Sequence, residues 1–136
     1  MESPSNARYD VATYPPQLKS VPIARRRVTR LVADWGHREF AADAALVTSE
    51  LVTNALLHGC LKDRLFRLEV ILTGTVLRIA VTDPKGERRP SLRADAGEDQ
   101  FGRGLAIVQA LAVRWDVEEL TVGKTVWAEL DLGVEL

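Results

Sequence analysis

The sequence contains a single cysteine, Cys60, among 136 residues. One cysteine excludes an internal disulfide and a cluster of thiolate metal ligands. The sequence also lacks any run near the roughly 18 apolar residues of a membrane span. Its first ten residues have no apolar stretch of the kind that marks a signal peptide. We therefore expect a cytoplasmic protein with no membrane attachment.

No excess of basic charge is present either, since 18 Lys and Arg residues stand against 19 Asp and Glu residues. This balance argues against direct nucleic-acid binding, which needs a basic surface. The two histidines, His37 and His58, have no cysteine or further histidine near them, so they do not form a zinc-binding pattern. The hydrophobic content of 46% is that of an ordinary globular domain.

The chain divides by composition into a short arm and one domain. Residues 1–19 hold three of the six prolines and form an N-terminal arm, with a short extended stretch at residues 9–14. Residues 20–136 form a single domain. Residues 84–101 are rich in Pro, Gly and charge, and we expect this long loop to act as a mobile lid.

Hydrophobic periodicity predicts helices at residues 20–36, 40–58 and 105–112, and strands at residues 65–72, 76–82, 114–120 and 125–132. Residues 73–75 are predicted to form a tight turn. This order indicates an α+β fold, a two-layer sandwich with the helices on one face of a mixed, mostly antiparallel sheet. The first helix carries four arginines on or beside its polar face, which fits either a solvated face or a docking surface: Arg25, Arg26, Arg27 and Arg30.

A polar stripe crosses the otherwise apolar helix at residues 40–58. Glu50, Asn54 and His58 are spaced four residues apart, so they lie along one side of the helix. A buried carboxylate needs a partner, a metal or a ligand. The same pattern also fits three residues that face water at the edge of the helix.

Two further features accompany this stripe. Asp83 ends a hydrophobic strand, where it is either a site residue or an ordinary turn residue. Gly102 and Gly104 lead into the helix at residues 105–112, and glycines at a helix N-terminus let backbone N–H groups approach a phosphate. A flexible loop end fits the glycines equally well.

In their order and spacing, these three segments resemble the sequence boxes of the GHKL ATPase superfamily, which has the Bergerat ATP-binding fold. The segment Glu50–Gly59 resembles its N box, Asp83 its second box, and Gly102-Arg103-Gly104-Leu105 its third box. The small size, the arginine-rich helix and the ending from Gly123 to Leu130 are similar to the anti-sigma factor serine/threonine-protein kinase subgroup. The resemblance covers roughly residues 20–132.

The resemblance implies Mg²⁺-ATP as the ligand and assigns roles to individual residues. Glu50 matches the general base that takes a proton from a serine hydroxyl or water. Asn54 matches the Mg²⁺ ligand, and His58 has a supporting position near the nucleotide. Asp83 matches the aspartate that accepts a hydrogen bond from the amino group of adenine.

The phosphate end and the last strand complete the implied site. Gly102, Gly104 and Leu105 belong to the phosphate-binding box, and Arg103 adds positive charge there. Thr125 matches a threonine that helps to hold adenine. The second box usually reads Asp-x-Gly-x-Gly, whereas this chain has Asp83-Pro84-Lys85-Gly86-Glu87; Gly86 falls between the usual glycines and remains a ligand-binding candidate.

Two functions follow from the resemblance. The first is a Mg²⁺-ATP-binding anti-sigma factor that phosphorylates a serine of an antagonist protein and so regulates transcription by partner switching. Its partners would be a sigma factor and that antagonist, and a homodimer remains open. The second is a non-catalytic module that sequesters a protein partner and binds ATP or another nucleotide without turnover. The intact Glu50 and Asn54 favour the first function, and the altered second box favours the second.

Overall fold

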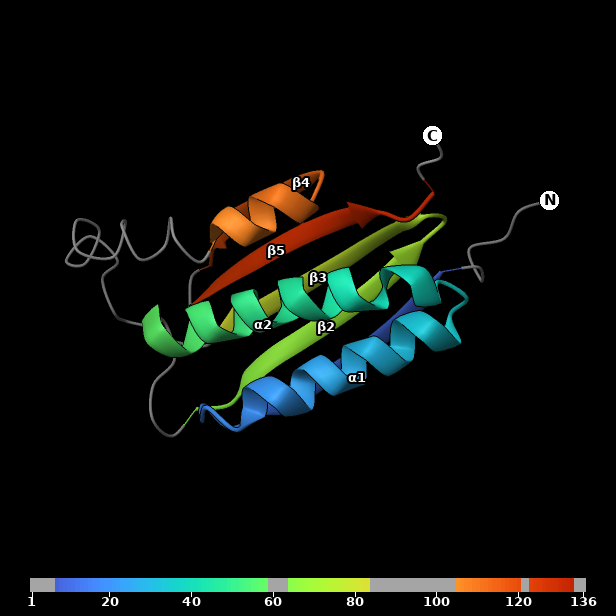
Figure 1. Cartoon of the computed structure of the whole chain (residues 1–136). Coiled ribbons are helices and arrows are strands. Elements are labelled where there is room, and N and C mark those ends of the chain that lie inside the picture. The colour runs from blue at the N-terminus through green and yellow to red at the C-terminus, as the bar shows by residue number, and fades with distance from the viewer. Residues whose placement is uncertain (1–6, 59–63, 84–104, 121–122, 134–136) are drawn as a thin grey trace.

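The protein is an α+β domain in which helices cover one face of an antiparallel sheet (Figure 1). A computed structural model describes residues 7–58, 64–83, 105–120 and 123–133. The strands are β1 (Arg8–Tyr14), β2 (Phe66–Thr73), β3 (Val76–Asp83), β4 (Arg114–Glu119) and β5 (Lys124–Asp131). The helices are α1 (Ser20–Asp34), the short 3₁₀ helix η2 (Arg38–Phe40) and α2 (Ala41–His58), and residues 105–111 are also helical. The predicted fold class is confirmed.

The five strands follow the order β1-β2-β3-β5-β4. All four ladders between the described strands are antiparallel, which agrees with the predicted mixed, mostly antiparallel sheet except that none of these ladders is parallel. The β2–β3 hairpin turns at Gly74, whose φ of +63° lies in the left-handed region that glycine adopts without strain. The predicted tight turn at residues 73–75 is therefore confirmed.

Part of the expected N-terminal arm belongs to the sheet. Residues 8–14 form the edge strand β1, which pairs with β2 over its whole length, from Arg8 opposite Leu72 to Tyr14 opposite Phe66. Composition did not predict this pairing, because the strand is short and mostly exposed, with a buried side chain only at Tyr14. The Tyr14 ring packs on that of Phe66, with the ring centroids 5.6 Å apart.

A bidentate ion pair links β1 to helix α1. The Arg27 guanidinium donates from Nε and Nη2 to the two carboxylate oxygens of Asp10, at 2.7 and 2.8 Å. Both side chains are partly buried, with 36% of Arg27 and 19% of Asp10 exposed. The fork geometry and partial burial make this pair stronger than an ordinary surface ion pair.

We expect Asp10→Ala to lower the free energy of unfolding by about 1 kcal/mol, because it removes both hydrogen bonds. Urea denaturation of Asp10→Ala, Arg27→Ala and the double variant measures the coupling between the two side chains. If the effects of the two single substitutions simply add, the ion pair does not stabilise the fold.

The core lies between the helices and the inward face of the sheet. α1 contributes Ala24, Val28 and Val32, and α2 contributes a longer row that includes Val47, Leu51 and Val52, all at most 1% exposed. By length and composition, the segment Arg38–Leu57 could also cross a membrane, but half of it is buried inside the domain. Such burial is the packing of a core helix.

The opposite face of the sheet carries polar side chains. The guanidinium of Arg78 lies 4.1 Å from the ring centroid of Trp127 and donates to Glu129 at 3.2 Å. Arg114 donates to the same carboxylate from the neighbouring strand. Within the described residues, no helix covers this face.

Candidate functional site

The predicted site elements converge at one end of the molecule. α2 runs across the sheet so that its C-terminal half, the end of β3 and the beginning of β5 lie at the same end (Figure 1). The register agrees, because Asp83, the last residue of β3, is opposite Lys124, the first residue of β5. The polar residues of α2 and the end of β3 are thus part of one region.

Glu50 is partly buried on α2, and its burial among apolar neighbours raises the pKa of its carboxyl group above the ordinary value of 4.5. Partial removal from water disfavours the charged form, and no ion pair of Glu50 with the described residues offsets this. A carboxylate with a raised pKa holds a proton more readily. This is the property that a general base needs as it accepts a proton from a hydroxyl group.

The raised pKa predicts a pH-dependent effect of Glu50→Gln on stability. At pH 7 the Glu50 carboxylate is less well solvated in the folded protein than in the unfolded chain, so we expect Glu50→Gln to raise the free energy of unfolding. The gain is a fraction of a kcal/mol, since solvent screens the partly exposed group. Below the ordinary pKa of 4.5, Glu50 is protonated in both states and the gain disappears. Denaturant titrations at pH 7 and pH 4 test this, and an equal gain at both would exclude charge as the cause.

Asn54 follows Glu50 by one helical turn and is almost fully buried, with 4% of its surface exposed. Its amide nitrogen Nδ2 has no hydrogen-bond partner among the described residues. Leaving such a group buried and unpaired costs about 1–3 kcal/mol, so native proteins seldom do this without a reason. Rotation of the amide presents either its N–H₂ group or its carbonyl oxygen, and the latter is a hard donor suited to Mg²⁺.

Asp83 is buried with 1% exposure on the side of the sheet that faces the helices. It follows Leu77, Ile79 and Val81, which are buried at alternate positions of β3. A carboxylate in this position has to be paired or bonded to a ligand, and Asp83 is engaged in an interaction within the protein. Its place at the end of β3, on the same side as α2, agrees with the predicted site.

Thr125 lies on the other side of the sheet. Successive residues of a strand point to opposite faces, and Val126, Ala128 and Leu130 of β5 face the core. Thr125 therefore faces away from the helices, where its hydroxyl shares a hydrogen bond of 2.7 Å with Thr82. The structure does not bring Thr125 to Asp83. Lys124, which the sequence analysis missed, is the residue of β5 opposite Asp83. The alternation of apolar residues at Val126, Ala128 and Leu130 would have predicted that Lys124 shares their face of the sheet.

The remaining predicted residues lie outside the described part or in the core. The lid at residues 84–101 and the residues Gly86, Gly102, Arg103 and Gly104 are outside the described residues. His58 is the last residue of α2, but its side chain is also outside the described part. Leu105 is 3% exposed and packs in the hydrophobic core, so its side chain anchors the helix at residues 105–111 to the sheet.

The donor set fits a nucleotide-bound metal better than a resident one. Among the described residues, no group of three or more His, Cys, Asp or Glu side chains could hold a metal ion. One buried amide can supply a single ligand, and Mg²⁺ commonly completes its shell with substrate phosphates and water. Asn54 is therefore suited to hold Mg²⁺ that arrives with ATP.

Helices over one face of an antiparallel sheet, with a buried amide and a buried carboxylate at one end, define an ATP-binding domain of the GHKL type. The family described as the histidine kinase-like ATPase domain matches residues 14–130. The chain belongs to this family, and membership implies that it binds ATP. The chain is also similar to an uncharacterized protein of Streptomyces coelicolor, with 46% identity over 54 residues, which are 39% of this chain and 50% of the relative.

Proposed function

We propose that the protein is an anti-sigma factor with Mg²⁺-ATP-dependent protein-serine kinase activity. The observation that carries the kinase part is the pair on α2: a partly buried Glu50 with a raised pKa, one turn before the buried Asn54, whose Nδ2 has no hydrogen-bond partner in the described part of the chain. A module that binds nucleotide without turnover could use Asn54 in the same way, but it has no need of a general base at Glu50.

Each residue performs one part of the reaction. Bound Mg²⁺ would neutralise the charge that develops on the transferring phosphoryl group, and Asn54 would hold it through its amide oxygen. Glu50 orients the attacking serine hydroxyl and accepts its proton, which needs the carboxylate form. Asp83 accepts a hydrogen bond from the base and so fixes the far end of the nucleotide.

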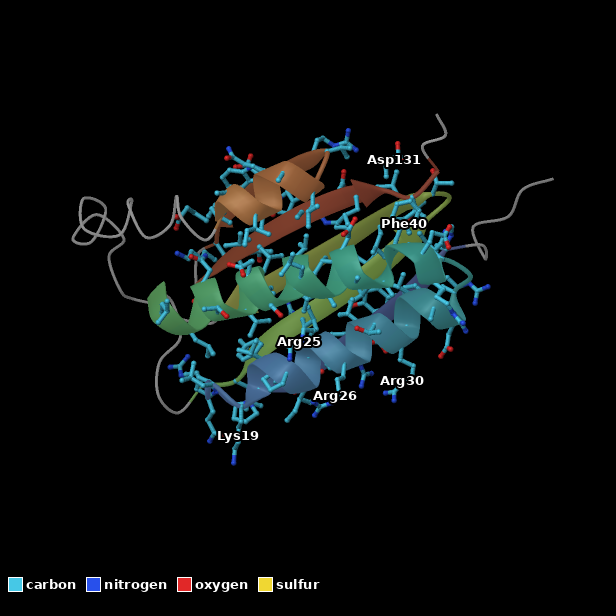
Figure 2. The ribbon with its side chains drawn as sticks, viewed as in Figure 1. Lys19, Arg25, Arg26, Arg30, Phe40 and Asp131 are labelled. Atoms are coloured by element: carbon cyan, nitrogen blue, oxygen red, sulfur yellow. The ribbon has the colours of Figure 1, made fainter. Side chains whose placement is uncertain are left out.

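The sigma factor and the antagonist protein are proposed as partners on the resemblance to the anti-sigma subgroup. The outer face of α1 supports a docking role. Lys19, which directly precedes α1, and Arg26 and Arg30 project from the side turned away from α2 (Figure 2). Arg25 is also exposed but lies toward α2, where it donates to the Ser49 hydroxyl at 3.3 Å. None of these four side chains forms an ion pair with a described residue. A cationic face on a protein of net charge −1 suits a partner with a local acidic surface.

The test is phosphoryl transfer from radiolabelled ATP to a purified candidate antagonist of the same organism. The proposal predicts Mg²⁺-dependent labelling of a serine on the antagonist. It also predicts that the labelled antagonist no longer displaces the sigma factor. ATP binding without any labelling would contradict the kinase part and favour the second candidate, a regulatory module that binds nucleotide without turnover; the altered box after Asp83 is the feature that favours it.

A further inference from the structure

Lys124 occupies the position next to the buried carboxylate at the base end of the site. It is opposite Asp83 in the β3–β5 ladder. It shares the phase of Val126 and Ala128, which face the helical layer, and it is partly buried. Side chains directly opposite each other in an antiparallel ladder have Cβ atoms about 4.5–5.5 Å apart, within reach of a lysine ammonium group.

The burial of the two candidate anions around Lys124 differs. On its other side Lys124 is paired with Glu119 of β4, which is exposed, whereas Asp83 is 1% exposed. Water and salt screen an exposed pair far more than a buried one. The charge of Lys124 therefore acts most strongly on Asp83, which is the group proposed to recognise the base.

We propose that Lys124 determines the base specificity of this nucleotide site, by placing a hydrogen-bond donor beside the acceptor Asp83 so that the site accepts guanine as well as adenine. This inference rests on the proposed function, since it assigns Asp83 to the base. It concerns a residue that the family resemblance did not single out.

The reason lies in the edges of the two purines. Adenine carries an amino group where guanine carries the O6 oxygen. A carboxylate accepts a hydrogen bond from the amino group, but it repels an oxygen in the same place. A lysine ammonium group has three donors and no acceptor, so Lys124 can donate to O6 and offset this repulsion. A site with both groups satisfies either base, whereas Asp83 alone favours adenine.

The test compares binding of ATP and GTP to the full chain by calorimetry, with Mg²⁺ present. We expect the wild-type protein to bind GTP within about tenfold of ATP. We expect Lys124→Met to keep ATP affinity within about threefold and to weaken GTP by at least about tenfold, since O6 then meets an uncompensated carboxylate. Lys124→Arg retains a cationic donor and should retain GTP binding.

Arg38→Met is the matched control, because it removes one positive charge from an exposed position of η2 that has no role in the proposed site or docking face. It should change neither affinity. A wild-type protein that binds ATP more than about tenfold tighter than GTP would overturn the inference. A Lys124→Met variant that loses both nucleotides equally, or that keeps its GTP affinity, would overturn it too. If the wild type binds neither nucleotide, the proposed function fails, and the inference fails with it.

A second measurement examines the pair without nucleotide. Unfolding free energies of Asp83→Asn, Lys124→Met and the double variant form a cycle. The inference predicts that the double variant is more stable than the sum of the single effects implies. Simple additivity would show that Lys124 does not act on Asp83.

Discussion

Substituting Glu50 by Ala is expected to lower the rate of phosphoryl transfer by a factor of about 10²–10⁴, the usual contribution of a general base. The affinity for Mg²⁺-ATP should stay within about threefold of the wild type. This separation is expected because Glu50 acts on the hydroxyl that attacks, whereas Asn54 and Asp83 hold the two ends of the nucleotide. Single-turnover transfer measures the rate, and calorimetry measures the affinity.

Glu39→Ala is the matched control for this experiment. Glu39 is an exposed glutamate in η2, the short helix that precedes α2. Its loss should leave both transfer and binding unchanged. If Glu50→Ala loses ATP affinity as strongly as it loses transfer, Glu50 holds the nucleotide instead of activating the hydroxyl, and the assigned role is wrong.

The second large effect is expected for Asn54→Ala. Loss of the metal ligand should weaken Mg²⁺-ATP binding at least about tenfold, or about 1.4 kcal/mol. Binding of ATP without Mg²⁺ should change much less. The stability of the ligand-free protein should not fall as it does for most buried polar residues, because Nδ2 has no partner among the described residues to lose.

The combination of weaker binding and unchanged stability separates a ligand role from a structural one. Thr53→Ala, a change at the adjacent and only partly buried position of α2, serves as the control and should leave Mg²⁺-ATP binding intact. A drop of several kcal/mol in the stability of Asn54→Ala, with nucleotide binding unaffected in the remaining folded protein, would show that Asn54 is a core residue.

Most of the fold could be predicted because its core elements are strongly periodic. α2 begins at Ala41 and β3 ends at Asp83, within a residue or so of the predicted boundaries. β1 was harder to predict as part of the domain, because an exposed edge strand has little hydrophobic pattern and is stabilised by pairing with β2 and by the Asp10–Arg27 ion pair. Both are long-range contacts that no local pattern contains.

The site was predictable where one helix carries it and less so where strands meet. The spacing of Glu50 and Asn54 is fixed by the helix itself, so their shared side follows directly from the sequence. Thr125 was expected near the base because of its neighbours in the sequence, but adjacent residues of a strand face opposite ways. Lys124 and Asp83 are cross-strand neighbours because of the β3–β5 register, and the sequence alone does not specify that register.

The central claim is that α2 and β3 form a site for ATP in which Asn54 holds the metal. Calorimetric titration of the full chain with ATP, in the presence and absence of Mg²⁺, tests it most directly. The account predicts saturable binding of one ATP per chain that is at least about tenfold tighter with Mg²⁺. Absence of binding under both conditions, or binding of equal strength with and without Mg²⁺, would contradict it.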